Sequence, residues 1–246
     1  MKFTRRETLT LAAAATAAGV AGLPSIALAK DGDVIDQLKL MAPAGIPDKI
    51  LGNPNAKVTV IEYASPTCPH CAAFSNTVLQ SFQDKYVTTG KVKFILRPFA
   101  RNTMDAAIFM LAEAASQPAA ITAAAPGASS EASTAPVAAA SPDVSAAAAA
   151  SYENVLSAYF RTQGTWGVSD KPLDAVKAVA VQLGFSDDSF NAALKNQAYF
   201  DAVQKMRDQA VNDFGLEGTP TFYINGKSMS GEKSLDELSA EIDPLL

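Results

Sequence analysis

The residues best suited to chemistry in this chain occupy four consecutive positions, Cys68-Pro69-His70-Cys71. These positions hold both cysteines and the only histidine of the 246 residues. Two thiols three positions apart can form a structural disulfide, supply half of a metal site or act as a redox-active pair. The surrounding sequence has to discriminate among these three uses.

A metal or haem site is disfavoured by the ligands that are present. Structural zinc needs about four ligands, and His70 lies between the two cysteines, where its ring cannot readily close a tetrahedron with both sulfurs. A c-type haem motif requires histidine directly after the second cysteine, and Ala72 stands there. We therefore expect neither a metal nor any other cofactor.

The position of the pair favours redox chemistry over a structural disulfide. A disulfide that encloses two residues constrains the unfolded chain little, because the stabilisation grows with loop length. Cys68 follows an apolar strand and precedes a helical pattern, so the free N–H groups of the helix start favour its thiolate, which is the nucleophile. Pro69 suits the first helical turn, His70 is expected to stabilise the thiolate further, and Cys71 is placed to resolve a mixed disulfide. Cys68 should be the exposed thiol.

The elements around the pair follow from hydrophobic periodicity. Residues 57–63 are almost continuously apolar, as in a strand buried on both faces. Phe74, Val78, Phe82 and Tyr86 recur every four residues and predict a helix. Residues 91–99 read as a second strand. Strand, helix and strand predict a βαβ unit with a parallel pair.

A mainly helical segment interrupts this pattern. Residues 104–115 read as a helix, after which the Ala/Ser/Pro-rich segment at about 112–150 carries prolines in every possible long helix and few large apolar side chains. We interpret most of that segment as a weakly ordered loop. Helices then resume from residue 151, over 172–183, where Gly184 follows, and over about 187–214, where Gly215 follows.

The α/β pattern returns near the C-terminus. Residues 219–224 read as a strand, Asn225-Gly226 as a tight hairpin turn and residues 227–230 as a short partner strand. Ser234 and Glu237 form a capping box for a final helix, with Leu235, Leu238 and Ile242 facing inward. The order is βαβ, helical insertion, ββα, and the fold class is therefore α/β.

The first 29 residues have the build of a bacterial export signal. Lys2, Arg5 and Arg6 precede a weakly apolar stretch, and Ala27-Leu28-Ala29 resembles a cleavage site. The sequence TRRETL resembles a twin-arginine signal, and the general secretory route stays open. We expect a periplasmic protein. Residues 30–56 are interpreted as an N-terminal arm.

Charge excludes two classes of partner. The net charge is −5, and removal of residues 1–29, with three basic residues and one acidic residue, would leave −7. An acidic chain without a basic cluster is not suited to bind nucleic acid or anionic membrane surfaces.

Two motifs together resemble the thioredoxin superfamily, specifically its DsbA-type branch and the exported DsbA/BdbD-like group. VIEYASPTCPHC is similar to the strand and active-site segment of that family, and GLEGTPTFYINGK to its cis-proline loop and hairpin. The resemblance implies a thioredoxin fold over residues 57–103 and 215–246, with a helical insertion over 104–214.

The resemblance also assigns roles to three residues outside the tetrad. It implies that Pro220 is the cis-proline facing a Cys68–Cys71 disulfide and that Thr219 offers backbone to an extended substrate. Glu62 matches the buried acid beneath the active site. An exposed strand carboxylate is the alternative, but the apolar neighbours of Glu62 favour burial and a raised pKa suited to moving protons to Cys71.

Three other conspicuous side chains receive weaker interpretations. Trp166, the only tryptophan, is expected to pack in the core or between domains, with a substrate contact as the alternative. Arg97 and Arg101 are candidates for the active-site face, with a solvated position as the alternative.

These observations predict an exported thiol–disulfide oxidoreductase that introduces disulfides into exported proteins with free thiols. The resemblance implies a membrane quinone-linked reoxidase as partner, and we expect a monomer. A reductase or isomerase of the same fold is the alternative, since Thr219 before Pro220 also occurs there. A redox-silent, chaperone-like binding module is a further alternative, which the intact cysteine pair disfavours.

Overall fold

The computed structural model describes residues 31–42, 45–117 and 142–246, without the side chains of 142–144. The expected export signal lies outside these residues. The first half of the described chain contains α1 (Gln37–Leu40), β1 (Ile50–Gly52), β2 (Val58–Ala64), α2 (Pro69–Thr77), α3 (Leu79–Phe82), the π-helical turn Gln83–Val87, β3 (Val92–Pro98) and α4 (Thr103–Ala115). The second half contains α6 (Pro142–Arg161), α7 (Gln163–Trp166), α8 (Pro172–Gln182), α9 (Asp187–Leu194), α10 (Gln197–Phe214), β4 (Thr221–Ile224), β5 (Lys227–Ser230), α11 (Leu235–Ile242) and the 3-10 turn Asp243–Leu245.

The strands form one sheet in the order β1-β3-β2-β4-β5. β2 and β3 are parallel, with Val58 opposite Val92 and Ala64 opposite Pro98, as the βαβ pattern predicts. β2 is buried at every position because helices or the N-terminal arm cover both faces of the sheet. β4 pairs antiparallel with β2 and β5. The predicted α/β fold is confirmed.

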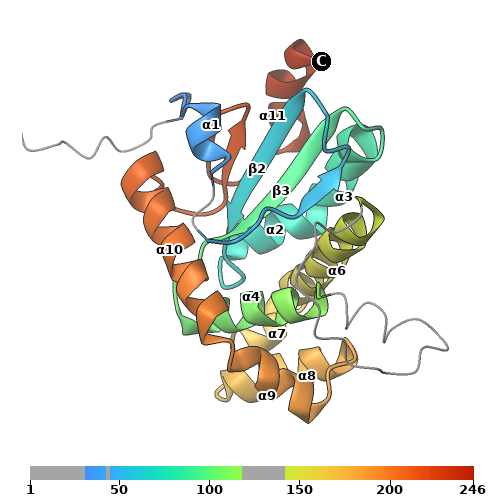
Figure 1. Ribbon diagram of the computed structural model, residues 1–246, viewed down its shortest axis with the longest axis vertical. Coiled ribbons are helices and arrows are strands. Elements are labelled where there is room, and N and C mark those ends of the chain that lie inside the picture. Colours follow the sequence, from blue (N-terminus) through green and yellow to red (C-terminus); the bar gives the residue numbers. More distant parts are fainter. Residues whose placement is uncertain (1–30, 43–44, 118–141) are drawn as a thin grey trace, which may run out of the picture.

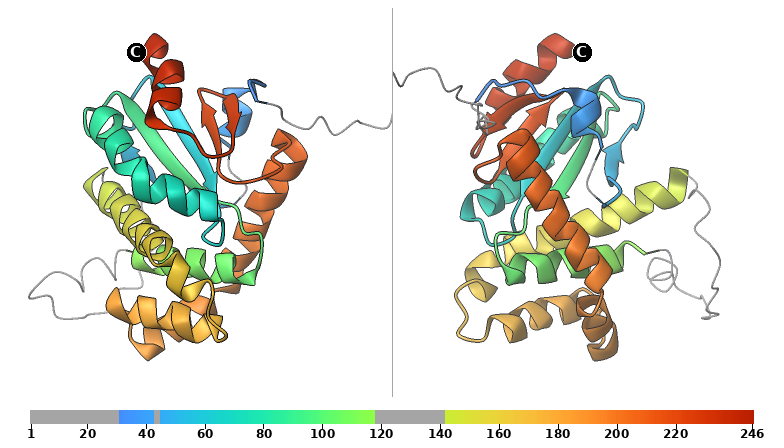
Figure 2. Two further views of the ribbon diagram at one scale, coloured as in Figure 1. Left: turned by 180° about the vertical axis from the view of Figure 1, so that it is seen from behind. Right: turned by 60° about the vertical axis from the view of Figure 1, so that its left-hand side comes forward.

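The helix after the cysteine pair packs on one face of the sheet together with α11 (Figure 2). The predicted apolar face of residues 74–86 is buried at Phe74, Phe82 and Tyr86. The segment is divided into α2, α3 and a π-helical turn instead of one regular helix. Phe74 packs edge-on against Phe222 of β4, with ring centroids 4.8 Å apart, and this contact fixes α2 over the centre of the sheet.

The N-terminal arm crosses the opposite face of the sheet from one edge to the other (Figure 1). Its first residues pair with β5, where Gly32 N–H donates to Ser228 and Ile35 N–H to Gly226. The arm then forms α1 and ends in β1, which pairs antiparallel with β3. The arm therefore lies at both sides of the sheet, as the edge strand β1 beside β3 and as a single bridge from Val34 to Lys227 beside β5.

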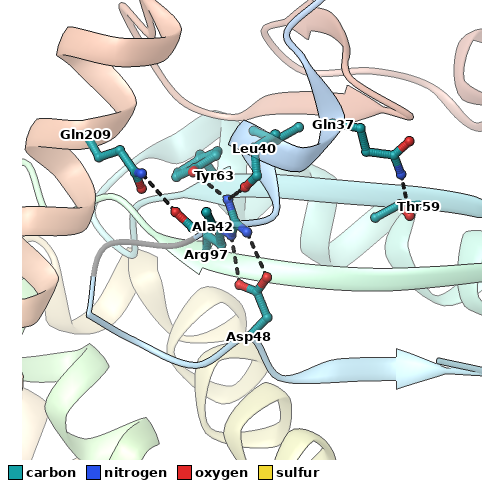
Figure 3. A network of polar contacts seen from close by, with 8 residues as sticks. All are labelled: Gln37, Leu40, Ala42, Asp48, Thr59, Tyr63, Arg97 and Gln209. Carbon is teal, nitrogen blue, oxygen red and sulfur yellow. Dashed lines mark hydrogen bonds and ion pairs between the residues drawn. The ribbon is translucent and has the colours of Figure 1, made fainter.

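Arg97 of β3 anchors the arm (Figure 3). Its guanidinium binds both carboxylate oxygens of Asp48 at 2.7 and 2.8 Å and donates to the Leu40 carbonyl and the Tyr63 hydroxyl. Arg97 is 1% exposed, so the predictions of an active-site or a solvated position were both wrong. A buried guanidinium requires this full set of acceptors. Arg101 is exposed.

The helical insertion lies beyond one end of the sheet, with α4, α8 and α9 clustered there and α10 running back along the sheet (Figure 1). α6 begins at Pro142, so the interpretation of residues 142–150 as a loop was wrong. Proline is tolerated in the first helical turn, and Ala149 and Tyr152 are buried by tertiary packing. Residues 118–141 lie outside the described residues.

The insertion differs from the predictions in the helix over residues 187–214 and agrees with them in the position of Trp166. The helix expected over 187–214 is divided into α9 and α10, because the Asn196 side chain caps α10 by accepting from Tyr199 N–H. Trp166 is buried, as predicted, and its Nε1–H donates to the Tyr159 carbonyl at 2.8 Å. No helix in the described part of the chain is long and apolar enough to span a membrane.

Candidate active site

The strand register brings two distant segments to the same end of the sheet. Tyr63 near the end of β2 lies opposite Thr221 at the start of β4. Residues 65–71 continue from β2 and residues 219–220 precede β4, so the cysteine pair and the Thr219-Pro220 peptide meet there. The Thr219–Pro220 peptide bond is cis, and the carbonyl of Thr219 lies 3.1 Å from the Cys68 sulfur.

Cys68 occupies the N-cap position of α2, with Pro69 in the first helical turn. Cys71 lies one turn further along α2 and is buried. Both cysteines are free thiols in this structure. The predicted placement of the pair at a strand-to-helix junction is therefore correct. At this position the Cys68 sulfur faces N–H groups that have no partner within the helix.

The surroundings of Cys68 stabilise its thiolate. The pKa of Cys68 is lowered to about 5. The hydrogen bond from the Cys71 thiol is the largest cause, and burial of the Cys68 side chain acts in the opposite direction. Thr219 and the backbone N–H groups of Cys71 and His70 lower it further. The Thr219 hydroxyl is buried without a hydrogen-bond partner among the described residues, so it is available to donate to the thiolate. At neutral pH, Cys68 is therefore ionised in the dithiol form.

Cys71 has the opposite protonation behaviour. Burial raises the pKa of its thiol well above the usual range, and the hydrogen bond to Cys68 and the charge of Glu62 raise it further. One sulfur is therefore a thiolate and the other a thiol at neutral pH. A thiolate is the form that attacks or leaves in disulfide exchange, so the two cysteines are chemically distinct.

Cys68 is less accessible than the sequence predicts. It is 2% exposed and Cys71 is fully buried, so the prediction of an exposed Cys68 thiol was wrong. The Thr219 carbonyl lies against its sulfur, and the Gln163 side chain lies against its carbonyl oxygen. What separates the two cysteines is their proton affinity and not their exposure.

Glu62 is buried on β2, as the sequence predicts, with 2% of its surface exposed. Burial is the main cause that raises its pKa to about 8, and the charges of Cys68 and Glu153 add to the effect. At neutral pH this carboxyl is mostly protonated. It is close enough to influence the proton affinity of Cys71.

His70 is placed differently from the prediction. Its backbone N–H faces the Cys68 sulfur, whereas its ring is 68% exposed and hydrogen-bonded through Nδ1 to Oε2 of Glu232 at 3.1 Å. Pro69 is exposed and Pro220 is buried. The sequence analysis did not identify Glu232, which is 162 positions away from His70.

A buried carboxylate that the sequence analysis missed holds the loop before Cys68. Asp105, near the start of α4, accepts hydrogen bonds from the Ser65 hydroxyl at 2.8 Å, from Thr67 N–H at 2.7 Å and from Arg101 N–H at 2.8 Å. Asn102 caps α4 and also donates to the Thr67 hydroxyl. The spacing Asn-x-x-Asp at a helix start was the available signal, and it resembles a capping box.

The helical insertion contributes a second clamp. Gln163, the first residue of α7, donates from Nε2 to the carbonyls of Pro66 at 2.7 Å and Cys68 at 2.9 Å. Asn76 of α2 in turn donates to the Phe160 carbonyl of α6. No three of the His, Cys, Asp and Glu side chains in the described ranges gather where they could hold a metal ion.

The thioredoxin family matches this chain over residues 46–135 and 128–244. A "Putative protein-disulfide oxidoreductase" of Rickettsia felis is 25% identical over 199 residues, which are 81% of this chain and 60% of that protein. The chain therefore spans about 60% of the length of this curated relative.

Solved structures share the architecture. A variant of alpha-DsbA1 from Wolbachia pipientis is 26% identical, with a TM-score of 0.67 over 86% of this chain and 96% of that chain. Oxidised BdbD from Bacillus subtilis, 17% identical, shows the same fold with a TM-score of 0.61 over 88% of this chain and 98% of that chain. The chain belongs to the thioredoxin family, and its helical insertion between β3 and β4 places it with the DsbA-type members.

Proposed function

We propose that this chain is an exported thiol–disulfide oxidoreductase that introduces disulfides into exported proteins through Cys68 and Cys71. The observation that carries the proposal is the opposite proton affinity of the two sulfurs, with the pKa of Cys68 lowered to about 5 and that of Cys71 raised. A stabilised thiolate favours the dithiol form and makes the disulfide a stronger oxidant. This supports the oxidase over the reductase or isomerase.

In the first step, a substrate thiolate attacks the Cys68 sulfur of the Cys68–Cys71 disulfide. A substrate–Cys68 disulfide forms, the bond between the two cysteines breaks, and Cys71 leaves as a thiolate. Because its pKa is raised, Cys71 takes up a proton. Glu62, protonated at neutral pH, is the donor in this proposal.

In the second step, another substrate thiolate attacks the substrate sulfur of the mixed disulfide. A substrate disulfide forms, and Cys68 leaves as the stabilised thiolate. The substrate has lost two electrons and the enzyme holds them as a dithiol. The Thr219 carbonyl lies 3.1 Å from the Cys68 sulfur, and Pro220 follows Thr219 through a cis peptide bond. Both residues are proposed to contact the substrate backbone beside the reacting sulfur.

Export and partners complete the proposal. The charged, apolar and small-residue pattern of residues 1–29 supports export to the periplasm by the twin-arginine or general secretory route. Renewed oxidation of the dithiol requires an acceptor of two electrons, and a quinone-linked membrane reoxidase has that chemistry. We propose that the enzyme is a monomer.

The test is oxidation of reduced, unfolded ribonuclease under a limited supply of oxidised glutathione, followed by recovery of ribonuclease activity. The wild-type protein should accelerate recovery, and a Cys68→Ala variant should not. Equal recovery with both proteins would reject the oxidase. Acceleration of insulin reduction by the wild type without ribonuclease oxidation would favour the reductase. Suppression of aggregation that does not depend on Cys68 would favour the binding module.

A further inference from the structure

The turn between β5 and α11 reaches the dipeptide between the two cysteines. Glu232 in this turn places Oε2 3.1 Å from Nδ1 of His70. A carboxylate accepts hydrogen bonds and does not donate them, so Nδ1 carries the proton of this bond. Their side chains are 68% exposed for His70 and 39% for Glu232. The contact is therefore at the surface beside the site and outside the buried network.

The backbone that carries Glu232 is held on both sides. Gly231 adopts a φ of +81°, which suits glycine, and its N–H donates to the carbonyl of Pro220 at 2.8 Å. On the other side, the capping box of Ser234 and Glu237 begins α11. The same turn therefore touches the Pro220 loop through its backbone and the Cys-x-x-Cys segment through a side chain.

Two anionic groups lie beside His70, and its ring is hydrogen-bonded to one of them. One is the Glu232 carboxylate, to which it is bonded. The other is the Cys68 thiolate, which already faces the backbone N–H of His70. A ring that donates its Nδ1 proton to the Glu232 carboxylate stabilises the negative charge of the Cys68 thiolate less. We propose that Glu232 is a positioning residue that holds the His70 ring away from the Cys68 thiolate and thereby makes the disulfide a weaker oxidant.

This inference rests on the proposed redox role of the pair and adds a residue that adjusts it. Removal of the carboxylate frees the ring for the thiolate. The dithiol form is then favoured, and the disulfide becomes more oxidising. Because exposed ion pairs are weak, the expected change is about 1.5- to 5-fold in the equilibrium constant with glutathione.

The experiment measures that constant for the wild type, Glu232→Gln, His70→Ala and the double variant. Glu232→Gln should shift the equilibrium toward the dithiol by about 1.5- to 5-fold, and the substitution should have little effect when His70 is absent. Asp236→Asn, which removes an equal charge from the exposed first turn of α11, is the matched control and should leave the constant unchanged.

A direct readout accompanies the equilibrium. His70 is the only histidine, so the imidazole nitrogen signals in the NMR spectrum come from this one ring. The chemical shift of Nδ1 should change in Glu232→Gln and stay the same in Asp236→Asn. A general loss of structure would not produce this difference between the two variants.

Three results would overturn the inference. The first is an unchanged constant in Glu232→Gln, and the second is the same shift with and without His70, which would indicate a direct charge effect on Cys68. The third is a wild-type pair that does not exchange with glutathione, which would also reject the proposed function. Normal exchange in the wild type with either of the first two results rejects only the role of Glu232.

Discussion

The side-chain amide of Gln163 donates to the carbonyl oxygen of Cys68 at 2.9 Å. Gln163 belongs to the helical insertion and Cys68 to the thioredoxin-fold part of the chain, and 95 positions separate them. The same nitrogen also donates to Pro66. The buried Trp166 at the other end of α7 fixes the helix that carries this clamp. The insertion thus holds the loop before the cysteines in place.

Replacing Gln163 with Ala should destabilise the dithiol form. The substitution removes two hydrogen bonds to buried carbonyls, each worth about 0.5–1.5 kcal/mol, so the free energy of unfolding should fall by about 1–3 kcal/mol in urea titrations. Oxidation of reduced ribonuclease should also become slower, because the loop that carries Cys68 is less constrained. Gln182→Ala, at an exposed position on α8, is the control. Equal loss of stability in both variants would contradict the clamp.

The two cysteines should not be interchangeable. Because only Cys68 is ionised near neutral pH, iodoacetamide should modify Cys68 and spare Cys71 in the reduced native protein at pH 6.5. Cys71→Ala should accumulate mixed disulfides with reduced ribonuclease, visible on non-reducing gels, and Cys68→Ala should form few. The Cys68→Ala/Cys71→Ala protein controls for non-covalent association. Similar trapping by both single variants would reverse or remove the assignment.

Glu62→Gln should change how stability depends on pH. The folded protein holds a proton on Glu62 up to a pKa of about 8, whereas the unfolded chain releases it near 4.5. The folded state therefore binds more protons in this interval, and its stability falls as pH rises from about 4.5 to about 8. Gln has no such proton, so the variant should exceed the wild type by up to about 5 kcal/mol at pH 9 and match it near pH 4.

The measurement is urea unfolding of both reduced proteins at pH 4, 7 and 9. The difference between them isolates Glu62, because Cys68 is present in both. A constant difference across the three pH values would show that Glu62 does not titrate in this interval. In the proposed mechanism, the more stable variant should also oxidise ribonuclease more slowly at pH 7, since Gln supplies no proton to Cys71.

Arg97 should matter for stability and not for the redox pair. Arg97→Met leaves the Asp48 carboxylate, 9% exposed, without its partner, which should cost about 3–5 kcal/mol in urea unfolding. The double variant Arg97→Met/Asp48→Leu should recover much of this loss, because no charge remains buried. Side chains alternate along a strand, so Tyr63 and Glu62 face opposite sides of the sheet. Because Arg97 donates to Tyr63, its network lies on the side of the sheet away from Glu62.

The control for this prediction is the equilibrium constant with glutathione, which should stay unchanged in both Arg97 variants. A shifted constant would show that the arm influences the cysteine pair through the sheet. An unaltered free energy of unfolding in Arg97→Met would show that the network does not anchor the arm.

Most of the fold follows from local patterns that the sequence carries. The apolar run of β2, the four-residue period of α2 and α3, Gly215 at the end of α10 and the capping box of Ser234 each depend on neighbours within a few positions. Such signals hold wherever the segment lies in the fold. The alanine-rich start of α6 is the exception, because a run of small residues becomes a stable helix only when packing covers one face, as at Ala149.

The amino-acid sequence by itself determined the cysteine pair, its place at the start of a helix, the buried acid Glu62 and the resemblance to the DsbA-type branch. Only the tertiary structure decided what surrounds the pair. Asp105 contacts the loop before the pair, and Gln163 and Glu232 contact residues 68 and 70, across separations of 38 to 162 positions. No local pattern encodes contacts across such separations. In the folded chain, Cys68 is buried against the Thr219 carbonyl and the ring of His70 is hydrogen-bonded to Glu232. Both partners come from distant segments, so only the tertiary structure brings them into contact.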